Sequence, residues 1–88
     1  MKMKLSHILV EQRYEAEDLI RKLADGEPFE KLAQKFSKCP SSQRGGSLGE
    51  IELKRLDPDF AAAAETLKAG QISEVVKTRF GHHLIRRE

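Results

Sequence analysis

Several residue types are scarce in this chain of 88 residues, and each scarcity excludes a class of protein. A single cysteine rules out an internal disulfide and suits a reducing compartment, which favours a cytoplasmic location. Tryptophan is absent and aromatic residues make up only 6% of the chain, so no row of aromatic side chains is available for stacking on bases. No stretch of about 18 apolar residues occurs, so we expect no membrane-spanning helix.

Charge of a single sign is also missing. Sixteen basic and 14 acidic residues leave a net charge of +2, which is too even to predict nucleic acid as a partner. The first four residues carry two lysines, but the apolar stretch after them is short and polar within, so we expect no signal peptide. Six basic residues could still form a surface patch: Lys31, Lys35, Lys38, Arg44, Lys54 and Arg55.

Hydrophobic periodicity predicts an α+β domain that spans residues 1–88. Alternating or short apolar runs predict strands over 5–10, 47–53, 72–77 and 82–87. Apolar residues at helical spacing predict three helices, over 16–24, 28–36 and 58–67. Asp57 is expected to cap the third helix with Pro58 at its first position, and Gly26 and Gly70 are expected to follow helix ends. Three amphipathic helices need a sheet to cover, so a sheet of about four strands is expected.

Two histidines lie in strands at opposite ends of the chain. His7 belongs to the first predicted strand and His83 to the last. Terminal strands in a small domain usually pair, because an unpaired strand leaves backbone polar groups unsatisfied. Pairing would bring both imidazoles into one sheet, with the lone Cys39 and a glycine-rich turn at 44–49 between them in sequence. His82 alternates with His83 and is expected on the opposite face, in a surface role.

The chain resembles the parvulin-type peptidyl-prolyl cis/trans isomerases. Six blocks carry the resemblance, in the family's order: residues 6–10 (SHILV), 36–42 (FSKCPSS), 44–49 (RGGSLG), Phe60, 70–73 (GQIS) and 78–85 (TRFGHHLI). The resemblance implies the order β-α-α-α-β-α-β-β, with a four-stranded antiparallel sheet surrounded by four helices. The third of these would be a short helix between Cys39 and Arg44, and the first and last strands would be central.

The resemblance also implies a site and an activity. The activity would be rotation about X-Pro bonds during protein folding, on proline-containing peptides and unfolded segments. Apart from the resemblance, we expect a monomer without cofactor or metal. Members of the family commonly carry methionine where Leu56 stands. The polar floor of the site would be His7, Cys39, Thr78 and His83, and its proline pocket would be Leu48, Leu56, Phe60 and Phe80.

Other interpretations of these residues stay open. The histidines could simply brace two strands, and Cys39 could be a small buried side chain or, with its pKa lowered by the histidines, a nucleophile. Since isomerisation transfers no acyl group, a non-covalent role for Cys39 is favoured. A zinc site from His7, Cys39 and His83 matches no known spacing. Cys39→Asp should retain activity on this interpretation, because aspartate also occurs there in the family.

Substrate preference and competing functions follow from the same residues. Phosphate-directed parvulins carry a longer basic loop after the first strand, whereas residues 11–17 here place Arg13 among acidic neighbours. We therefore expect no preference for phosphorylated residues before proline, and a hydrophobic residue there instead. The competing functions are a peptide-binding module that holds clients without catalysis and a small nucleic-acid-binding domain.

Overall fold

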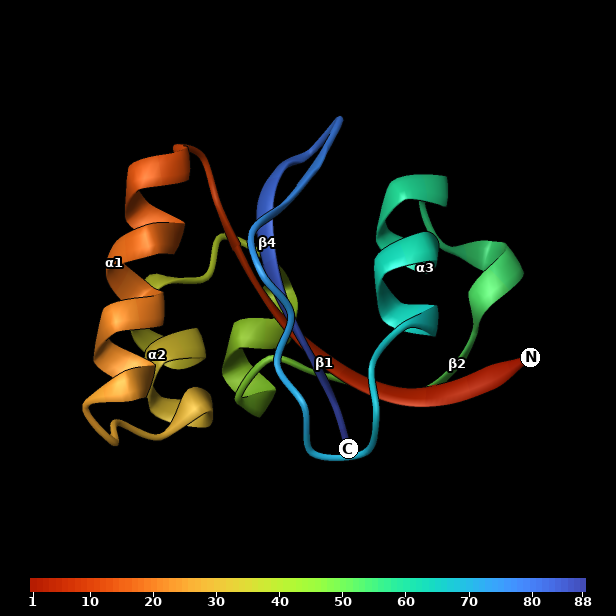
Figure 1. The fold of residues 1–88 in the computed structure, drawn as a ribbon, viewed down its shortest axis with the longest axis horizontal. Helices are drawn as coiled ribbons and strands as arrows, with labels where there is room; N and C mark the ends of the chain where they lie inside the picture. The colour runs from red at the N-terminus through yellow and green to blue at the C-terminus, as the bar shows by residue number, and fades with distance from the viewer.

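The computed structural model describes residues 1–88 and contains one antiparallel sheet of four strands. The strand order is β2-β1-β4-β3, so the first and last strands are central, as expected. These two strands run side by side and antiparallel through the middle of the molecule, with the helices on either side (Figure 1). The strands span β1 Lys2–Val10, β2 Ser47–Glu52, β3 Val76–Thr78 and β4 Gly81–Arg87.

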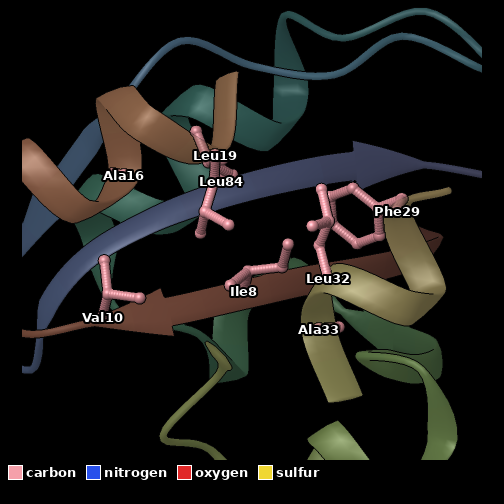
Figure 2. Close-up of a cluster of buried hydrophobic side chains, with 8 residues drawn as sticks. All are labelled: Ile8, Val10, Ala16, Leu19, Phe29, Leu32, Ala33 and Leu84. Carbon is pink, nitrogen blue, oxygen red and sulfur yellow. The ribbon is translucent and has the colours of Figure 1, made fainter. Parts of the chain in front are cut away.

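One face of the sheet is covered by α1 (Arg13–Ala24) and α2 (Phe29–Phe36). Ile8 of β1 and Leu84 of β4 point from the strands into these helices (Figure 2). Each fully buried aliphatic side chain of this kind stabilises the fold by roughly 1.5–3 kcal/mol. The eight buried residues of this cluster are Ile8, Val10, Ala16, Leu19, Phe29, Leu32, Ala33 and Leu84.

The other face packs against α3 (Pro58–Glu65), which lies across the sheet from α1 (Figure 1). Leu5 and Ile85 come from the central strands, and Phe60 and Ala64 come from the helix. The helix begins where predicted, because Asp57 Oδ1 accepts hydrogen bonds from the backbone N–H groups of Asp59, at 2.9 Å, and Phe60, at 3.4 Å. This cap fixes the entry of the chain into the helix that carries Phe60.

The strand register determines which side chains meet on the α3 face. His7 lies opposite Ile85, and Leu9 lies opposite His83. Side chains two positions apart share a face, so His7 and His83 are diagonal neighbours on the same side of the sheet. His82 points the other way, and its Nδ1 lies 3.1 Å from the carbonyl oxygen of Glu11.

The structure differs from the predicted elements in several places. β2 ends at Glu52 because the chain turns into a 3-10 helix, Leu53–Arg55. The predicted strand over 72–77 is reduced to Val76–Thr78, with only a single bridge between Ile72 and Arg86 before it. Phe36 continues the apolar spacing of the helix predicted over 28–36, but it is 42% exposed in the last turn of α2, where Lys22 Nζ lies 5.9 Å from its ring centroid.

The number of helices also differs from the expectation of four. Three are α-helices, and the segment expected to form the extra one is a 3-10 helix, Pro40–Arg44. Its five residues leave the segment too short for an α-helix of ordinary length. None of the helices has the length and apolar character needed to cross a bilayer.

Candidate functional site

A pocket of about 380 Å³ opens on the α3 side of the sheet. The two central strands supply its floor, α3 and the residues before it supply one wall, and the segment before Pro40–Arg44 supplies another. The tip of the β3–β4 hairpin reaches its rim through Phe80. The lining residues are His7, Leu9, Lys38, Cys39, Pro40, Leu48, Leu56, Asp57, Phe60, Phe80 and His83.

The two predicted histidines meet at the bottom of this pocket. The Nδ1 atoms of His7 and His83 are 3.0 Å apart, and both side chains are buried. Their rings lie nearly parallel, at 19°, with centroids 5.2 Å apart. Phe60 presents its ring edge-on to both imidazoles, with centroid distances of 5.5 Å to His7 and 5.1 Å to His83. The aromatic contacts and the hydrogen bond together fix the orientation of both rings.

Thr78 extends this pair on the side away from the pocket. Its Oγ1 lies 2.7 Å from His83 Nε2 and accepts a hydrogen bond from the backbone N–H of Phe80 at 3.1 Å. Thr78 is buried and does not line the pocket. The sequence placed it on the polar floor, whereas the structure places it behind His83, as a support for that ring.

Both histidines are neutral near pH 7. Burial, together with the smaller effect of a positive charge on His83, lowers the pKa of His7 to about 4. Burial likewise lowers the pKa of His83 to about 4, while the carboxylate of Asp57 opposes this shift and a protonated His82 adds to it. A neutral pair shares a single proton between the two Nδ1 atoms, so one ring donates and the other accepts.

Counting hydrogen-bond partners indicates the direction of the donation. If the Thr78 hydroxyl donates to His83 Nε2, the His83 Nδ1–H donates to His7, and only His7 Nε2 lacks a partner. In the reverse order both the Thr78 hydroxyl proton and His7 Nε2 would lack partners. The first arrangement leaves fewer buried polar groups unsatisfied and is the one favoured.

Cys39 lines the pocket but lies outside the hydrogen-bonded chain. It is half-buried, and its Sγ makes no hydrogen bond to either imidazole. Its backbone is held by Ser37 Oγ, which accepts the Cys39 N–H at 3.4 Å, and by the bond from the Lys38 N–H to the Leu9 carbonyl at 2.7 Å. The alternative in which the histidines activate the thiol as a nucleophile therefore has no direct hydrogen bond to support it.

His7, Cys39 and His83 are the three side chains that could have formed a zinc site. No group of three His, Cys, Asp or Glu side chains in the chain is arranged to hold a metal ion.

A glycine holds the Cys39 loop against β1. His7 donates its backbone N–H to the carbonyl of Gly46 at 2.9 Å, just past an irregularity in the β1–β2 pairing. Gly46 has φ +86°, and a Cβ there would collide with the His7 carbonyl oxygen. The absence of a side chain at Gly46 thus allows the turn to approach closely the strand that carries His7.

The four predicted apolar residues of the pocket come from three separate parts of the chain. Leu48 is on β2, Leu56 lies just before α3 and Phe60 lies within it, and Phe80 is on the hairpin. Phe60 is 4% exposed and belongs to the core, while Phe80 is 61% exposed. All four predicted pocket residues therefore lie on one cavity with His7, Cys39 and His83.

Sequence reasoning missed four lining residues, for two different reasons. Leu9 alternates with His7 along β1, and that signal could have identified it. Lys38 and Pro40 flank Cys39, and Asp57 had been interpreted only as a helix cap. Their positions on the pocket depend on tertiary packing, which cannot be inferred from local sequence patterns.

Comparison with known proteins places the chain in a well-populated group. Residues 7–88 match the family described as "Rotamase: PPIC-type PPIASE domain". The chain is 41% identical to the foldase protein PrsA of Bacillus subtilis (strain 168) over 98% of its length, and 43% identical to that of Geobacillus sp. (strain WCH70) over 97%. It covers only 30% and 31% of those proteins, so it spans about a third of the curated relatives it matches.

Solved structures agree with this grouping. The crystal structure of PrsA from Bacillus subtilis superposes with a TM-score of 0.95 at 41% identity, covering 98% of this chain and 34% of that one. The solution structure of NmPin, the parvulin of Nitrosopumilus maritimus, has a TM-score of 0.87 at 40% identity and covers 98% and 94% of the two chains.

Proposed function

The chain belongs to the PPIC-type peptidyl-prolyl isomerase family, the parvulins, and from that membership we propose that it catalyses cis/trans rotation about X-Pro bonds. Its substrates would be proline-containing peptides and unfolded or flexible protein segments. The observation that carries the proposal is the neutral His7–His83 pair at the bottom of an apolar pocket. The foldase PrsA relatives support a role in protein folding.

The reaction needs no covalent step. Rotation about an X-Pro bond is opposed by a barrier of about 18–20 kcal/mol, because twisting the C–N bond breaks amide resonance. A site lowers this barrier by removing water from the imide and by holding groups that favour the twisted state over the planar one. The proline ring would lie against Leu48, Leu56, Phe60 and Phe80, the apolar part of the pocket.

The polar residues would act by fixed polarity and not by proton transfer. With pKa values of about 4, His7 and His83 stay neutral at pH 7 and keep a constant set of hydrogen bonds. Thr78 would hold His83 in place from behind. Cys39 would present a weakly polar thiol to the imide, and the lack of a hydrogen bond from its Sγ to an imidazole argues against a nucleophile, which needs an adjacent base.

The residue before proline would be hydrophobic. Arg13, the basic residue in the segment where a phosphate-binding loop would lie, has its Nε 3.6 Å from Glu17 Oε2 on the same helix. A phosphate needs several clustered cations to offset its desolvation, and one paired arginine does not supply them. We therefore propose no preference for phosphoserine or phosphothreonine at this position.

The remaining proposals concern the chain as a whole. Residues 1–88 would form one domain, which their radius of gyration of 11.6 Å supports, since about 12 Å is typical of a single domain of this size. The short 3-10 helix Pro40–Arg44 would count as the fourth helix of the family arrangement. We propose that the domain acts as a monomer without cofactor. A cytoplasmic location stays a prediction based on the single free cysteine.

A protease-coupled assay on a Leu-Pro peptide tests the activity. The protease cleaves only the trans isomer, so added protein should accelerate the slow phase in proportion to its concentration. Leu48→Arg, which places a charge in the pocket, should abolish the acceleration, while Ile20→Arg, on the exposed side of α1, should not. Peptide binding without acceleration would show a holding module instead of an isomerase.

A further inference from the structure

An ion pair joins the two rims of the pocket. Arg79 Nε, at the tip of the β3–β4 hairpin, lies 3.7 Å from Asp57 Oδ2, at the start of α3. The Asp57 side chain is only 10% exposed, while that of Arg79 is 77% exposed. The contact therefore links the buried start of α3 to the exposed tip of the hairpin.

The Asp57 side chain is held in one orientation because its other carboxylate oxygen, Oδ1, caps α3. Oδ1 accepts the N–H groups of Asp59 and Phe60 at the first turn of α3. The carboxylate cannot rotate freely without losing this cap, so Oδ2 is presented to Arg79 in a constant direction. The ion pair thus anchors the hairpin to the helix that carries Phe60.

Phe80 depends on this anchor. It is 61% exposed and lies in the two-residue loop of the hairpin, although it lines the pocket. Its backbone N–H donates to Thr78 Oγ1, and its ring packs against Arg79, whose guanidinium carbon lies 5.0 Å from the ring centroid. An exposed aromatic ring with few contacts samples several rotamers unless a neighbour restrains it.

We propose that Arg79 is a positioning residue that holds Phe80 over the open side of the proline pocket by bridging the hairpin to Asp57. The proposal rests on the proposed isomerase function. It adds a residue that sets the affinity of the pocket for the proline ring. Because the bridge acts on binding and not on the twisted imide, its loss should raise KM and leave kcat nearly unchanged.

The same pair also sets the charge beside His83. The Asp57 carboxylate raises the pKa of His83 against the effect of burial. Removal of the carboxylate should therefore lower the pKa of His83, and removal of the Arg79 cation paired with that carboxylate should raise it. Loss of the Arg79 charge and loss of the Asp57 charge should therefore shift the pKa of His83 in opposite directions. Both losses should raise KM.

The test uses Arg79→Gln, Asp57→Asn and the double variant. Asparagine caps a helix about as well as aspartate, so Asp57→Asn removes the ion pair and keeps the helix start. Each single variant should raise KM for a Leu-Pro peptide about three- to fivefold, which is the upper range for a solvent-exposed ion pair, and should lower the thermal midpoint by no more than a few degrees. The double variant should be no worse than either single one, because both remove the same contact.

A matched control is the exposed pair on α1, in which Arg21 Nη2 lies 3.1 Å from Asp18 Oδ1. Arg21→Gln should leave KM and the His83 titration unchanged. The proposal is overturned if the single variants keep the wild-type KM, if their effects multiply in the double variant, or if the pKa of His83 moves in the same direction in both. If the wild-type protein binds the peptide without turnover, the proposed function fails, and the dissociation constants of the same variants decide this proposal separately.

Discussion

His7 and His83, which are 76 residues apart in sequence, meet through Nδ1 atoms 3.0 Å apart on the two central strands. Burial keeps both rings uncharged at neutral pH, so the contact is a single directed hydrogen bond between neutral groups. Thr78 supports one ring, and Phe60 packs its edge against both. This arrangement gives the pocket a fixed polarity, from which the following predictions are derived.

Stability should decline as the pH falls through the window between about 6.5 and 4. The pKa of each of the two buried histidines is lowered from 6.5 in the unfolded chain to about 4 in the fold. The unfolded chain therefore binds more protons in this window, and the stabilisation present above pH 6.5 is lost as pH falls toward 4. Urea unfolding at a series of pH values measures this loss.

Ring titration by NMR identifies the groups responsible. The chain has three histidines, so the C2–H signals of His7 and His83 can be followed separately from that of His82. The two buried rings should show no titration between pH 6 and 8. A midpoint above pH 6 for either of them would contradict the neutral pair.

Cys39→Asp should retain appreciable isomerase activity. Aspartate keeps a small polar group at the same place on the pocket wall, and a non-covalent role needs no thiol. The protease-coupled assay measures the rate, with thermal unfolding as the check on folding. Near-complete loss of activity in a folded variant would instead support a nucleophilic cysteine.

For peptides that differ only in the residue before proline, kcat/KM should be higher when that residue is hydrophobic. Leu-Pro should be turned over at least as well as Glu-Pro or phosphoserine-Pro, because the pocket is mainly apolar and Arg13 is paired with Glu17. The comparison uses kcat/KM for the three peptides under the same salt conditions. A preference above about tenfold for the phosphorylated peptide would show a phosphate site that this account does not contain.

Truncation of Phe60 should lower the stability of the fold, whereas truncation of Phe80 should weaken substrate binding. Phe60 is buried in the core, so Phe60→Ala should lower the free energy of unfolding by about 3–5 kcal/mol, a large part of the stability of a small domain. Phe80 is exposed, so Phe80→Ala should change stability by less than about 0.5 kcal/mol and act on KM. Chemical denaturation and peptide kinetics on both variants check this contrast, which fails if Phe80→Ala is the more destabilising.

The sequence was sufficient for the parts of the fold that depend on local periodicity. The period of two along each terminal strand predicts that His7 and His83 share a face once the strands pair, and Asp57 with Pro58 predicts the start of α3. The family pattern brought Cys39 and the four apolar pocket residues to the same site.

Other features depend on distances between elements and could not be predicted. Phe36 continues the apolar stripe of α2, but the helix ends there and leaves its ring exposed. Asp57 caps a helix in a way that local sequence predicts, yet its contact with Arg79 requires the hairpin to lie over the pocket. The position of Thr78 behind His83 likewise follows from the hairpin register and not from any local pattern.

Exchange NMR on an X-Leu-Pro peptide at equilibrium tests the central claim most directly, since it needs no protease and reports rotation itself. Substoichiometric wild-type protein should produce exchange cross-peaks between the cis and trans signals, where uncatalysed exchange takes tens to hundreds of seconds. Leu48→Arg should remove them, and Ile20→Arg should not. Peptide shifts that report binding to the wild-type protein, with exchange no faster than in its absence, would contradict the account.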